Sequence, residues 1–224
     1  RAICERAREI NPKALIVGEV WEDASNKVAY SKRREYLQGH ELDSVMNYPL
    51  KESLISYIQT GNAGNLLNTV RVLINHYPKQ TVDCLMNILG THDTPRILTV
   101  LGEKHCENKN EMAKTTAYLT EYEREKALKR LKLAVVLQYT MPGVPCIYYG
   151  DEIGLEGLFD PMNRQTFPWD NIDTDLLDWY KFLGKLRKDF SSLKKGDFEE
   201  IYSSCGGYIF KRFDNSSTFF LEKQ

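Results

Sequence analysis

The sequence has little net charge and no clustered cysteines. Its 224 residues include 30 lysines and arginines and 31 aspartates and glutamates, which gives a net charge of −1. A chain without a basic excess has no general attraction for phosphate backbones, so we predict no nucleic-acid partner. The five cysteines form no Cys-x-x-Cys pair, which disfavours a zinc site or a dense disulfide framework. Reduced thiols and a cytoplasmic location are therefore predicted.

Long apolar runs and phosphate-binding loops are also missing. The longest wholly aliphatic run, 133-LAVVL-137, is far too short to cross a bilayer, so no membrane partner is predicted. The first residues show no signal peptide and instead place Ile3, Ala7 and Ile10 on one face of a helix over 2–10. No glycine-rich loop follows any predicted strand, which disfavours a nucleotide-binding open sheet.

The sequence does contain a repeated succession of strand-like and helix-like segments. Strands are predicted over 14–20, 43–47, 82–89 and 144–150, and helices over 51–59, 65–76, from 120 onward and over 174–190. The first run, ALIVGEV, is continuously apolar, as in a strand buried on both faces. Thr120 with Glu123 forms a capping-box pattern, and Thr174 is the predicted cap of the last helix. This alternation favours an α/β fold with a parallel sheet.

The pattern changes after Gly196. The stretches 198-FEEIYS-203, 207-GYIFKRF-213 and 217-STFFLEK-223 are rich in β-forming residues and are separated by turn residues. They predict antiparallel strands that are distinct from the parallel sheet.

Polar residues gather directly after the predicted parallel strands. These are Glu19, Asn47, His92 with Asp93, and Asp151 with Glu152. In a (β/α) barrel the carboxyl ends of the strands form the face on which active sites are built. An open doubly wound sheet also uses strand ends, but at one switch point. Because polar residues follow every strand, the pattern favours the barrel.

Two carboxyl groups in this set could serve in catalysis, and each has an alternative. Glu19 ends an apolar strand, where burial should raise its pKa and suit it to general acid chemistry. The alternative is an ordinary ion pair with a nearby lysine or arginine. Asp93 could stabilise charge in a site, or else Asp93 or Thr94 could cap a helix with Pro95 in its first turn.

The neighbouring residues also have a structural interpretation when each is taken alone. His92 could be a hydrogen-bonded structural histidine, Trp21 a packing residue, and Asp160 with Arg164 an exposed ion pair. Taken together, they indicate a carbohydrate hydrolase. Glycoside hydrolysis needs two carboxyl groups near the scissile bond, and an aromatic ring offers a flat apolar surface to a sugar.

Several segments carry a specific resemblance. They are 18-GEVW-21, 43-DSVMNYP-49, 91-THDTPR-96, 143-GVPCIYYGDEIGLEG-157 and 160-DPMNRQTFPWD-170. In this order they resemble the α-amylase family, glycoside hydrolase family 13, and above all its neopullulanase, cyclomaltodextrinase and maltogenic amylase branch. The resemblance implies an α/β fold: the C-terminal half, strands five to eight, of a TIM (β/α)8 barrel over 1–193. It further implies the beginning of an antiparallel β-sandwich domain over 194–224.

The resemblance also implies roles for individual residues in α-glucan cleavage. Glu19 matches the general acid/base, and Asp93 matches the carboxylate that stabilises the oxocarbenium-like transition state, with His92 beside it. Trp21 and Tyr48 match aromatic positions on the acceptor side of the scissile bond. Asp160 and Arg164 match the pair that holds the sugar on the glycone side. The implied substrates are cyclodextrins, pullulan and maltooligosaccharides.

The match departs from the family pattern in the nucleophile. The family's nucleophile is an Asp in an Arg-x-Asp motif at a strand end, and no such motif follows a predicted strand here. Glu22 stands where the branch often carries His, which leaves the acceptor-side preference open. We therefore expect the 224 residues alone to be inactive. The open edges of a half barrel are expected to be covered by self-association.

Two other interpretations of the sequence remain open. One is the oligo-1,6-glucosidase branch of the same family, and another is a non-catalytic relative that serves as a carbohydrate-binding or scaffold module. No metal and no cofactor are predicted for this chain, although the resemblance allows calcium in parts of an intact family member outside it.

Overall fold

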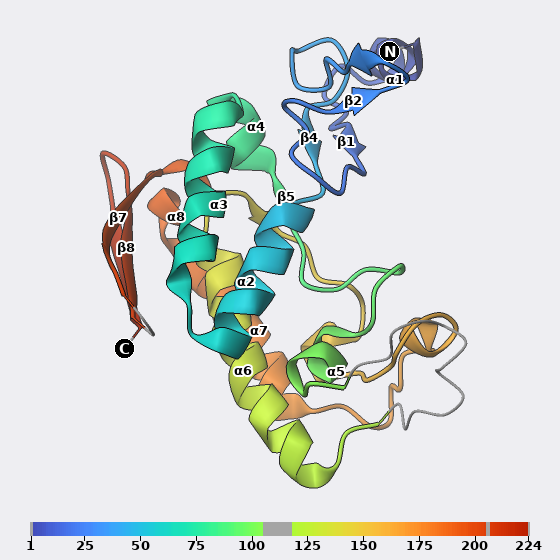
Figure 1. Cartoon of the computed structure of the whole chain (residues 1–224), viewed down its shortest axis with the longest axis vertical. Helices are drawn as coiled ribbons and strands as arrows, with labels where there is room; N and C mark the ends of the chain where they lie inside the picture. Colours follow the sequence, from blue (N-terminus) through green and yellow to red (C-terminus); the bar gives the residue numbers. More distant parts are fainter. Residues whose placement is uncertain (1, 105–117, 205–206, 224) are drawn as a thin grey trace.

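The computed structural model describes residues 2–104, 118–204 and 207–223, and its parallel strands are short (Figure 1). Within these residues four strands run parallel: β1 (Val17–Gly18), β4 (Ser44–Val45), β5 (Met86–Asn87) and β6 (Val144–Pro145). β1 pairs with β4 and β5 pairs with β6, and a parallel bridge between Met46 and Met86 joins the two pairs. The spatial order therefore follows the chain, as in successive strand–helix units.

Helices connect these strands and supply most of the buried apolar side chains. The described helices are α2 (Tyr48–Thr60), α3 (Ala63–His76), α4 (Lys79–Cys84), α5 (Ile97–Leu101), α6 (Glu121–Thr140), α7 (Thr174–Asp189) and α8 (Ser191–Lys195), besides α1 at the start. Leu66, Val70, Leu131 and Tyr180 are buried, in agreement with the helices predicted over these segments. In the described ranges, no helix combines the length and the apolar character that a membrane crossing needs.

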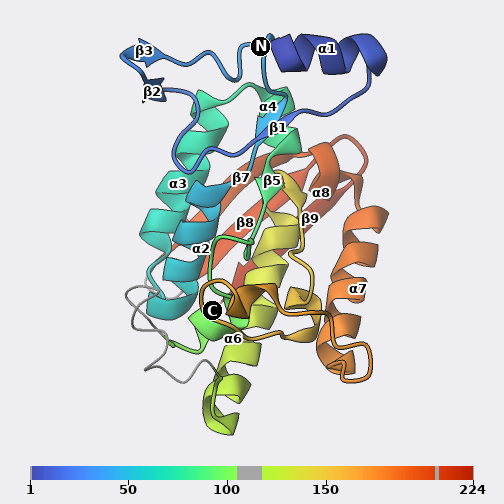
Figure 2. The same cartoon turned by 90° about the vertical axis from the view of Figure 1, so that its right-hand side faces the viewer.

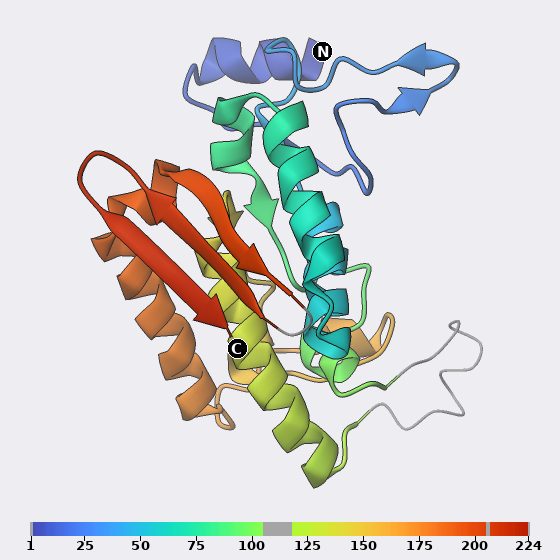
Figure 3. The same cartoon turned by 60° about the vertical axis from the view of Figure 1, so that its left-hand side comes forward.

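An antiparallel sheet lies beside the helices, where the sequence predicts such strands. Its described strands are β7 (Asp197–Ser203), β8 (Tyr208–Phe213) and β9 (Thr218–Lys223), in that order (Figure 3). The wholly buried Arg212 of β8 donates to the carbonyl oxygens of Thr140 at 2.8 Å and Gly196 at 2.9 Å. Since Thr140 ends α6, this guanidinium attaches the sheet to the helical layer.

The N-terminal region is more exposed to solvent than the sequence predicts. It comprises α1 (Ala2–Ile10) and a hairpin of β2 (Val28–Ala29) and β3 (Lys32–Arg33), which Figure 2 shows at one end of the molecule. The predicted inner face of α1 is wrong, because Ile3 is 84% and Ile10 73% exposed while Cys4 is buried. Instead, Arg8 holds α1 to the chain before β4 through an ion pair with Asp43 at 2.9 Å.

Two predicted strands differ from the observed ones. The prediction that 14–20 is buried on both faces is wrong: Leu15 is 61% exposed, because β1 has β4 as its only strand neighbour in the described chain. The segment 82–89 is not a strand throughout. Its first residues belong to α4, in which Lys79 pairs with Asp83 at 2.5 Å, one helical turn later.

Helix starts are governed by individual side chains. The capping box of Thr120 and Glu123 is confirmed at the start of α6. The cap of α7 lies one residue before the predicted one, since the Asp173 side chain accepts from the backbone N–H of Leu176. The helix α2 begins directly after Asn47, earlier than the predicted start at 51, because the Asn47 side chain accepts from the backbone N–H of Leu50 and Pro49 suits a first turn.

Buried amide side chains tie the carboxyl ends of the strands together. Asn47 donates from Nδ2 to Asn87 Oδ1 at 2.9 Å, and Asn87 donates to the carbonyl of Pro142 at 2.9 Å. Gln138 on α6 donates to the carbonyls of Asn87 and Cys146. The chain approaches closely at Gly143, whose φ is +114° and where a Cβ would lie 2.7 Å from Asn87 Oδ1. These bonds extend the two-residue backbone pairings.

Candidate active site

Glu19 and Tyr48 meet at the ends of neighbouring strands. Glu19 follows β1 directly and Tyr48 opens α2 just after β4. The Tyr48 hydroxyl donates to Glu19 Oε1 at 2.9 Å. Burial of the ring, with the adjacent Glu19 carboxylate as a further contribution, raises the pKa of Tyr48 to about 12, so the phenol keeps its proton and remains a donor. The apolar enclosure predicted for Glu19 is wrong, since its side chain is exposed in the described structure.

Trp21 lies flat on Tyr48. The two ring centroids are 4.0 Å apart and the ring planes differ by 15°. Tyr48 is buried, whereas Trp21 is 50% exposed. Trp21, packed on the buried Tyr48 ring, thus presents an aromatic surface to solvent beside Glu19, and such a surface can stack against the apolar face of a sugar ring.

His92 and Asp93 lie in a tight turn after β5. Two hydroxyls close the turn: Thr91 donates its backbone N–H to Thr94 Oγ1 at 3.2 Å, and Asp93 donates its N–H to Thr91 Oγ1 at 3.3 Å. His92 Nε2 lies 3.4 Å from Asp93 Oδ2. The helix-cap alternative for Asp93 and Thr94 is wrong, since α5 begins only after Arg96.

The two carboxylates and the imidazole converge on one exposed point. One ligand atom each from Glu19, His92 and Asp93 lies within 4.8 Å of the others. The strands that precede them, β1 and β5, are separated by β4, so the group joins segments that are not neighbours in strand order. Such a set could hold a cation, and among the described residues it is the one group with that geometry. It could equally flank a glycosidic bond.

Arg164 joins this group from the chain after β6. It belongs to the 3-10 helix η3 (Met162–Arg164) and donates from Nε to the carbonyl of His92 at 3.2 Å. Its terminal nitrogen lies 3.4 Å from Asp93 Oδ1, and its Nε lies 3.8 Å from Asp160 Oδ2. The structure therefore brings all the predicted site residues into one continuous group, while their roles stay predictions.

Asn163 is a site residue that the sequence analysis missed. It is wholly buried and donates to the backbone carbonyls of His92 and Thr94. The only signal in the sequence is its place directly before Arg164 in the quoted segment. Nothing in the residue type distinguishes it from an ordinary loop asparagine.

Asp151 turns away from the site. This residue of η2 (Asp151–Ile153) is 2% exposed, and its Oδ1 lies 3.2 Å from Arg96 Nη1. The Arg96 guanidinium lies over the rings of Tyr148 and Tyr149, at 4.3 and 4.6 Å from their centroids. Burial raises the pKa of Asp151 to about 7, although the attraction of Arg96 opposes the shift. Asp151 and the buried Asn47 therefore serve packing behind the site.

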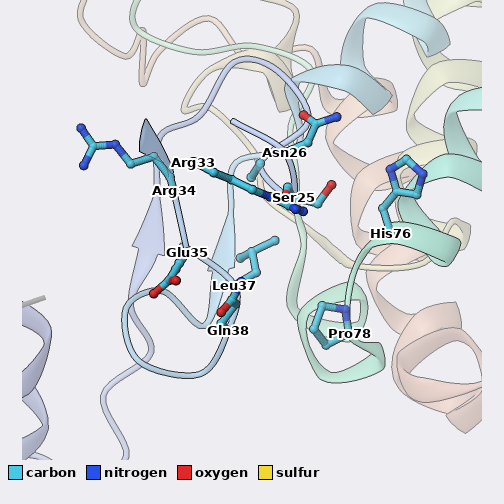
Figure 4. Close-up of a pocket in the computed structure, with 10 residues that line it drawn as sticks. Ser25, Asn26, Arg33, Arg34, Glu35, Leu37, Gln38, His76 and Pro78 are labelled. Carbon is cyan, nitrogen blue, oxygen red and sulfur yellow. The ribbon is translucent and has the colours of Figure 1, made fainter. Parts of the chain in front are cut away.

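A separate polar pocket lies between the β2–β3 hairpin and the end of α3. It has a volume of about 360 Å³, and Figure 4 shows Ser25, Arg33, Gln38 and His76 around it. Arg33 donates to the carbonyl of Ser25 at 3.0 Å. None of the predicted site residues lines this pocket, so it is not part of the carboxylate group.

One tripeptide has the Arg-x-Asp sequence but does not lie at the end of a strand, where the family pattern places it. Arg187-Lys188-Asp189 closes α7 and follows no strand. Arg187 is committed to structure, since it donates to the carbonyls of Tyr139 at 2.8 Å and Gly143 at 2.5 Å. This Asp is therefore not the strand-end nucleophile that the family pattern requires.

The fold and the site define a class of protein. Parallel strand–helix units with paired carboxyls, an imidazole and an aromatic surface at the strand ends are typical of enzymes that act on sugars. The family model described as "Alpha amylase, catalytic domain" matches residues 1–173. The chain therefore belongs to the alpha-amylase family, as the sequence motifs indicate.

Proteins with similar sequences carry the names amylopullulanase, neopullulanase and cyclomaltodextrinase. The chain is 38% identical over 216 residues to an amylopullulanase of Thermoanaerobacter thermohydrosulfuricus, covering 91% of this chain and 13% of the relative. It is 36% identical to neopullulanase 2 of Thermoactinomyces vulgaris over 197 residues, covering 85% and 28%. It is 32% identical to a cyclomaltodextrinase of Geobacillus thermopakistaniensis over 201 residues, covering 88% and 29%. The chain spans less than a third of each relative.

Solved structures of similar enzymes share the fold. The debranching enzyme of Nostoc punctiforme superposes with a TM-score of 0.79 at 26% identity, covering 99% of this chain and 43% of that one. A cyclomaltodextrinase superposes with a TM-score of 0.78 at 28% identity, covering 99% of this chain and 34% of that one.

The buried pair behind the site predicts a pH-dependent stability. Because the pKa of Asp151 is raised by burial to about 7, the folded state holds this proton more tightly than the unfolded state does. The stabilisation is complete below about pH 4 and is lost as the pH rises to about 7, by roughly 4 kcal/mol for a shift of about three units. Asp151→Asn should remove this fall, as measured by urea unfolding at several pH values.

The exposed Asp175→Asn is the matched control and should keep the wild-type pH dependence. If Asp151→Asn loses as much stability between pH 4 and 7 as the wild type does, the assignment of the proton to Asp151 is wrong.

Proposed function

We propose that these residues form part of a retaining α-glucan hydrolase of the neopullulanase and cyclomaltodextrinase type. The observation that carries the proposal is the convergence of Glu19, His92 and Asp93 within 4.8 Å from the ends of two non-neighbouring strands. The names of the similar proteins support cyclodextrins, pullulan or maltooligosaccharides as the substrates.

In this proposal each side chain has a defined task. Glu19 protonates the oxygen of the leaving sugar and later takes a proton from water. The Tyr48 hydroxyl holds one of its oxygens at 2.9 Å and so aims the other at the bond. Asp93 faces the positive charge that develops on the sugar ring, and Arg164 keeps that carboxylate in place. Trp21 supports the acceptor sugar.

The nucleophile is proposed to come from chain outside these 224 residues. The four parallel strands are proposed to be strands five to eight of a TIM barrel, and β7–β9 the start of a β-sandwich domain. In that arrangement the first strands of the barrel would lie beside β1 and β6 and would supply the missing carboxylate. A cytoplasmic location is part of the same proposal.

The 224 residues by themselves should not hydrolyse α-glucans. A retaining mechanism needs a nucleophile to form the glycosyl-enzyme, and Glu19 and Asp93 are already assigned to other tasks. Reducing-sugar release from γ-cyclodextrin and pullulan, measured on the purified chain, should equal that of a heat-inactivated sample. Turnover at even about 1 s⁻¹, within the ordinary enzyme range, would show that the chain supplies its own nucleophile.

Glu19→Gln in the complete polypeptide that carries these residues should lower kcat by about 10²- to 10⁴-fold, because the general acid is lost while its shape is kept. Binding of the uncleaved substrate, measured by calorimetry, should change little, since Trp21 and Arg164 remain. The exposed Glu35→Gln is the matched control and should cleave at the wild-type rate.

Three results would contradict this assignment in different ways. Full activity of Glu19→Gln removes the acid/base role. A wild-type polypeptide that binds α-glucans without cleaving them supports the non-catalytic binding relative. Cleavage confined to α-1,6 links in short oligosaccharides supports the oligo-1,6-glucosidase branch.

The exposed strand edges support a further proposal, that the 224-residue chain self-associates. Leu15 and Val17 beside β1 and Val144 with Ile147 at β6 are all exposed apolar side chains. Unpaired strand edges with such side chains favour pairing with another chain. Sedimentation equilibrium should detect a dimer, and Leu15→Lys with Val144→Lys should weaken it. A monomer at the highest concentrations tested contradicts this proposal.

A further inference from the structure

We propose that Asn163 is a positioning residue that fixes the backbone on both sides of Asp93. The inference rests on the proposed function, because it concerns the orientation of the carboxylate assigned to transition-state stabilisation. Asn163 cannot touch substrate itself, since its exposed fraction is 0%.

The geometry of the contact is specific to a carboxamide. Asn163 Nδ2 lies 2.8 Å from the carbonyl oxygen of His92 and 2.9 Å from that of Thr94. These two carbonyls belong to the residues before and after Asp93. A single NH₂ group has two hydrogens, so both are used to hold the backbone at His92 and at Thr94, on either side of Asp93.

The amide oxygen of Asn163 indicates that the residue is needed for its two N–H donors. Asn163 Oδ1 is buried and has no hydrogen-bond partner among the described residues. Leaving a buried acceptor unpaired is unfavourable, so the side chain is kept for its donors. An aspartate of the same shape would place oxygen atoms against two carbonyl oxygens. An alanine would remove this donor from both carbonyls and would leave the His92 carbonyl with the bond from Arg164 Nε at 3.2 Å.

The turn that carries Asn163 is itself firmly attached. Gln165 Nε2 donates to the carbonyls of Glu156 and Met162, each at 2.9 Å. Gly157 packs so closely that a Cβ there would lie 2.2 Å from the Met162 carbonyl oxygen. The Gly157 carbonyl also accepts from the backbone N–H of Arg96 at 2.9 Å. The Asn163 side-chain amide is therefore held in place and can position the Asp93 turn.

Without this donor the Asp93 turn depends on weaker contacts. The bonds between Thr91 and Thr94, and from Asp93 N–H to Thr91 Oγ1, range from 3.2 to 3.4 Å. Electrostatic stabilisation needs a carboxylate held within about 0.5 Å of its working place. The loss should therefore appear in kcat more than in KM, since the exposed aromatic surface of Trp21 is untouched.

The test compares Asn163→Asp and Asn163→Ala in the complete polypeptide that carries these residues, with hydrolysis of γ-cyclodextrin as the assay. Both variants should lower kcat about 10- to 100-fold while KM changes by less than about threefold. Hydrogen exchange should be at least tenfold faster at the amides of Asp93 and Thr94, with the exchange in α6 unchanged. The exposed Asn171→Ala, from the same connection, should match the wild type in both.

Each outcome decides a separate statement. If a folded variant shows the wild-type rate of hydrogen exchange at Asp93 and Thr94, the proposal that Asn163 fixes this turn is overturned. Faster exchange there with unchanged kcat overturns its part in the reaction. If Asn163→Asp does not fold, Asn163→Ala, which adds no buried charge, gives the same two readings. A wild-type polypeptide that cleaves no α-glucan overturns the proposed function, and exchange alone then decides whether Asn163 holds the turn.

Discussion

The buried amide network at the carboxyl ends of the parallel strands is the constraint on which the rest depends. β1 pairs with β4, and β5 with β6, over only two residues, and a single bridge joins the two pairs, so the backbone contributes few bonds. Asn47, Asn87 and Gln138 add side-chain bonds across β4, β5 and β6 at the same level. Because these amides are buried, losing one would leave its partners unpaired in an apolar surrounding. The network thus fixes where each strand ends and where the polar residues after it begin.

The site is a direct consequence of those strand ends. Glu19, Tyr48 and the His92–Asp93 turn follow β1, β4 and β5 in order, and Arg164 closes the group from the chain after β6. Buried side chains behind the site position its segments through hydrogen bonds, as Asn163 does for the Asp93 turn. In the proposed function the exposed groups carry the chemistry, while the buried carboxamides and guanidinium groups set their geometry.

Buried arginines have a second structural task, that of joining layers. Arg212 connects the antiparallel sheet to the end of α6, and Arg96 connects the start of α5 to the buried Asp151. Guanidinium groups suit this task because several donors leave one rigid plane and can reach carbonyls on different elements. No periodic pattern marks these positions, which is why the sequence analysis assigned no role to them.

The sequence by itself indicated four successive parallel strands with helices between them, the antiparallel strands that follow, and the candidate site residues that the structure brings together. Local rules suffice there, since helical spacing and motif letters are read along the chain. Only the tertiary structure decided that 82–84 is helical, that Leu15 and Ile3 are exposed, and that Asp151 and Asn163 face inward. Those outcomes depend on which neighbour covers a face or meets a donor, and contacts between distant segments leave no local pattern.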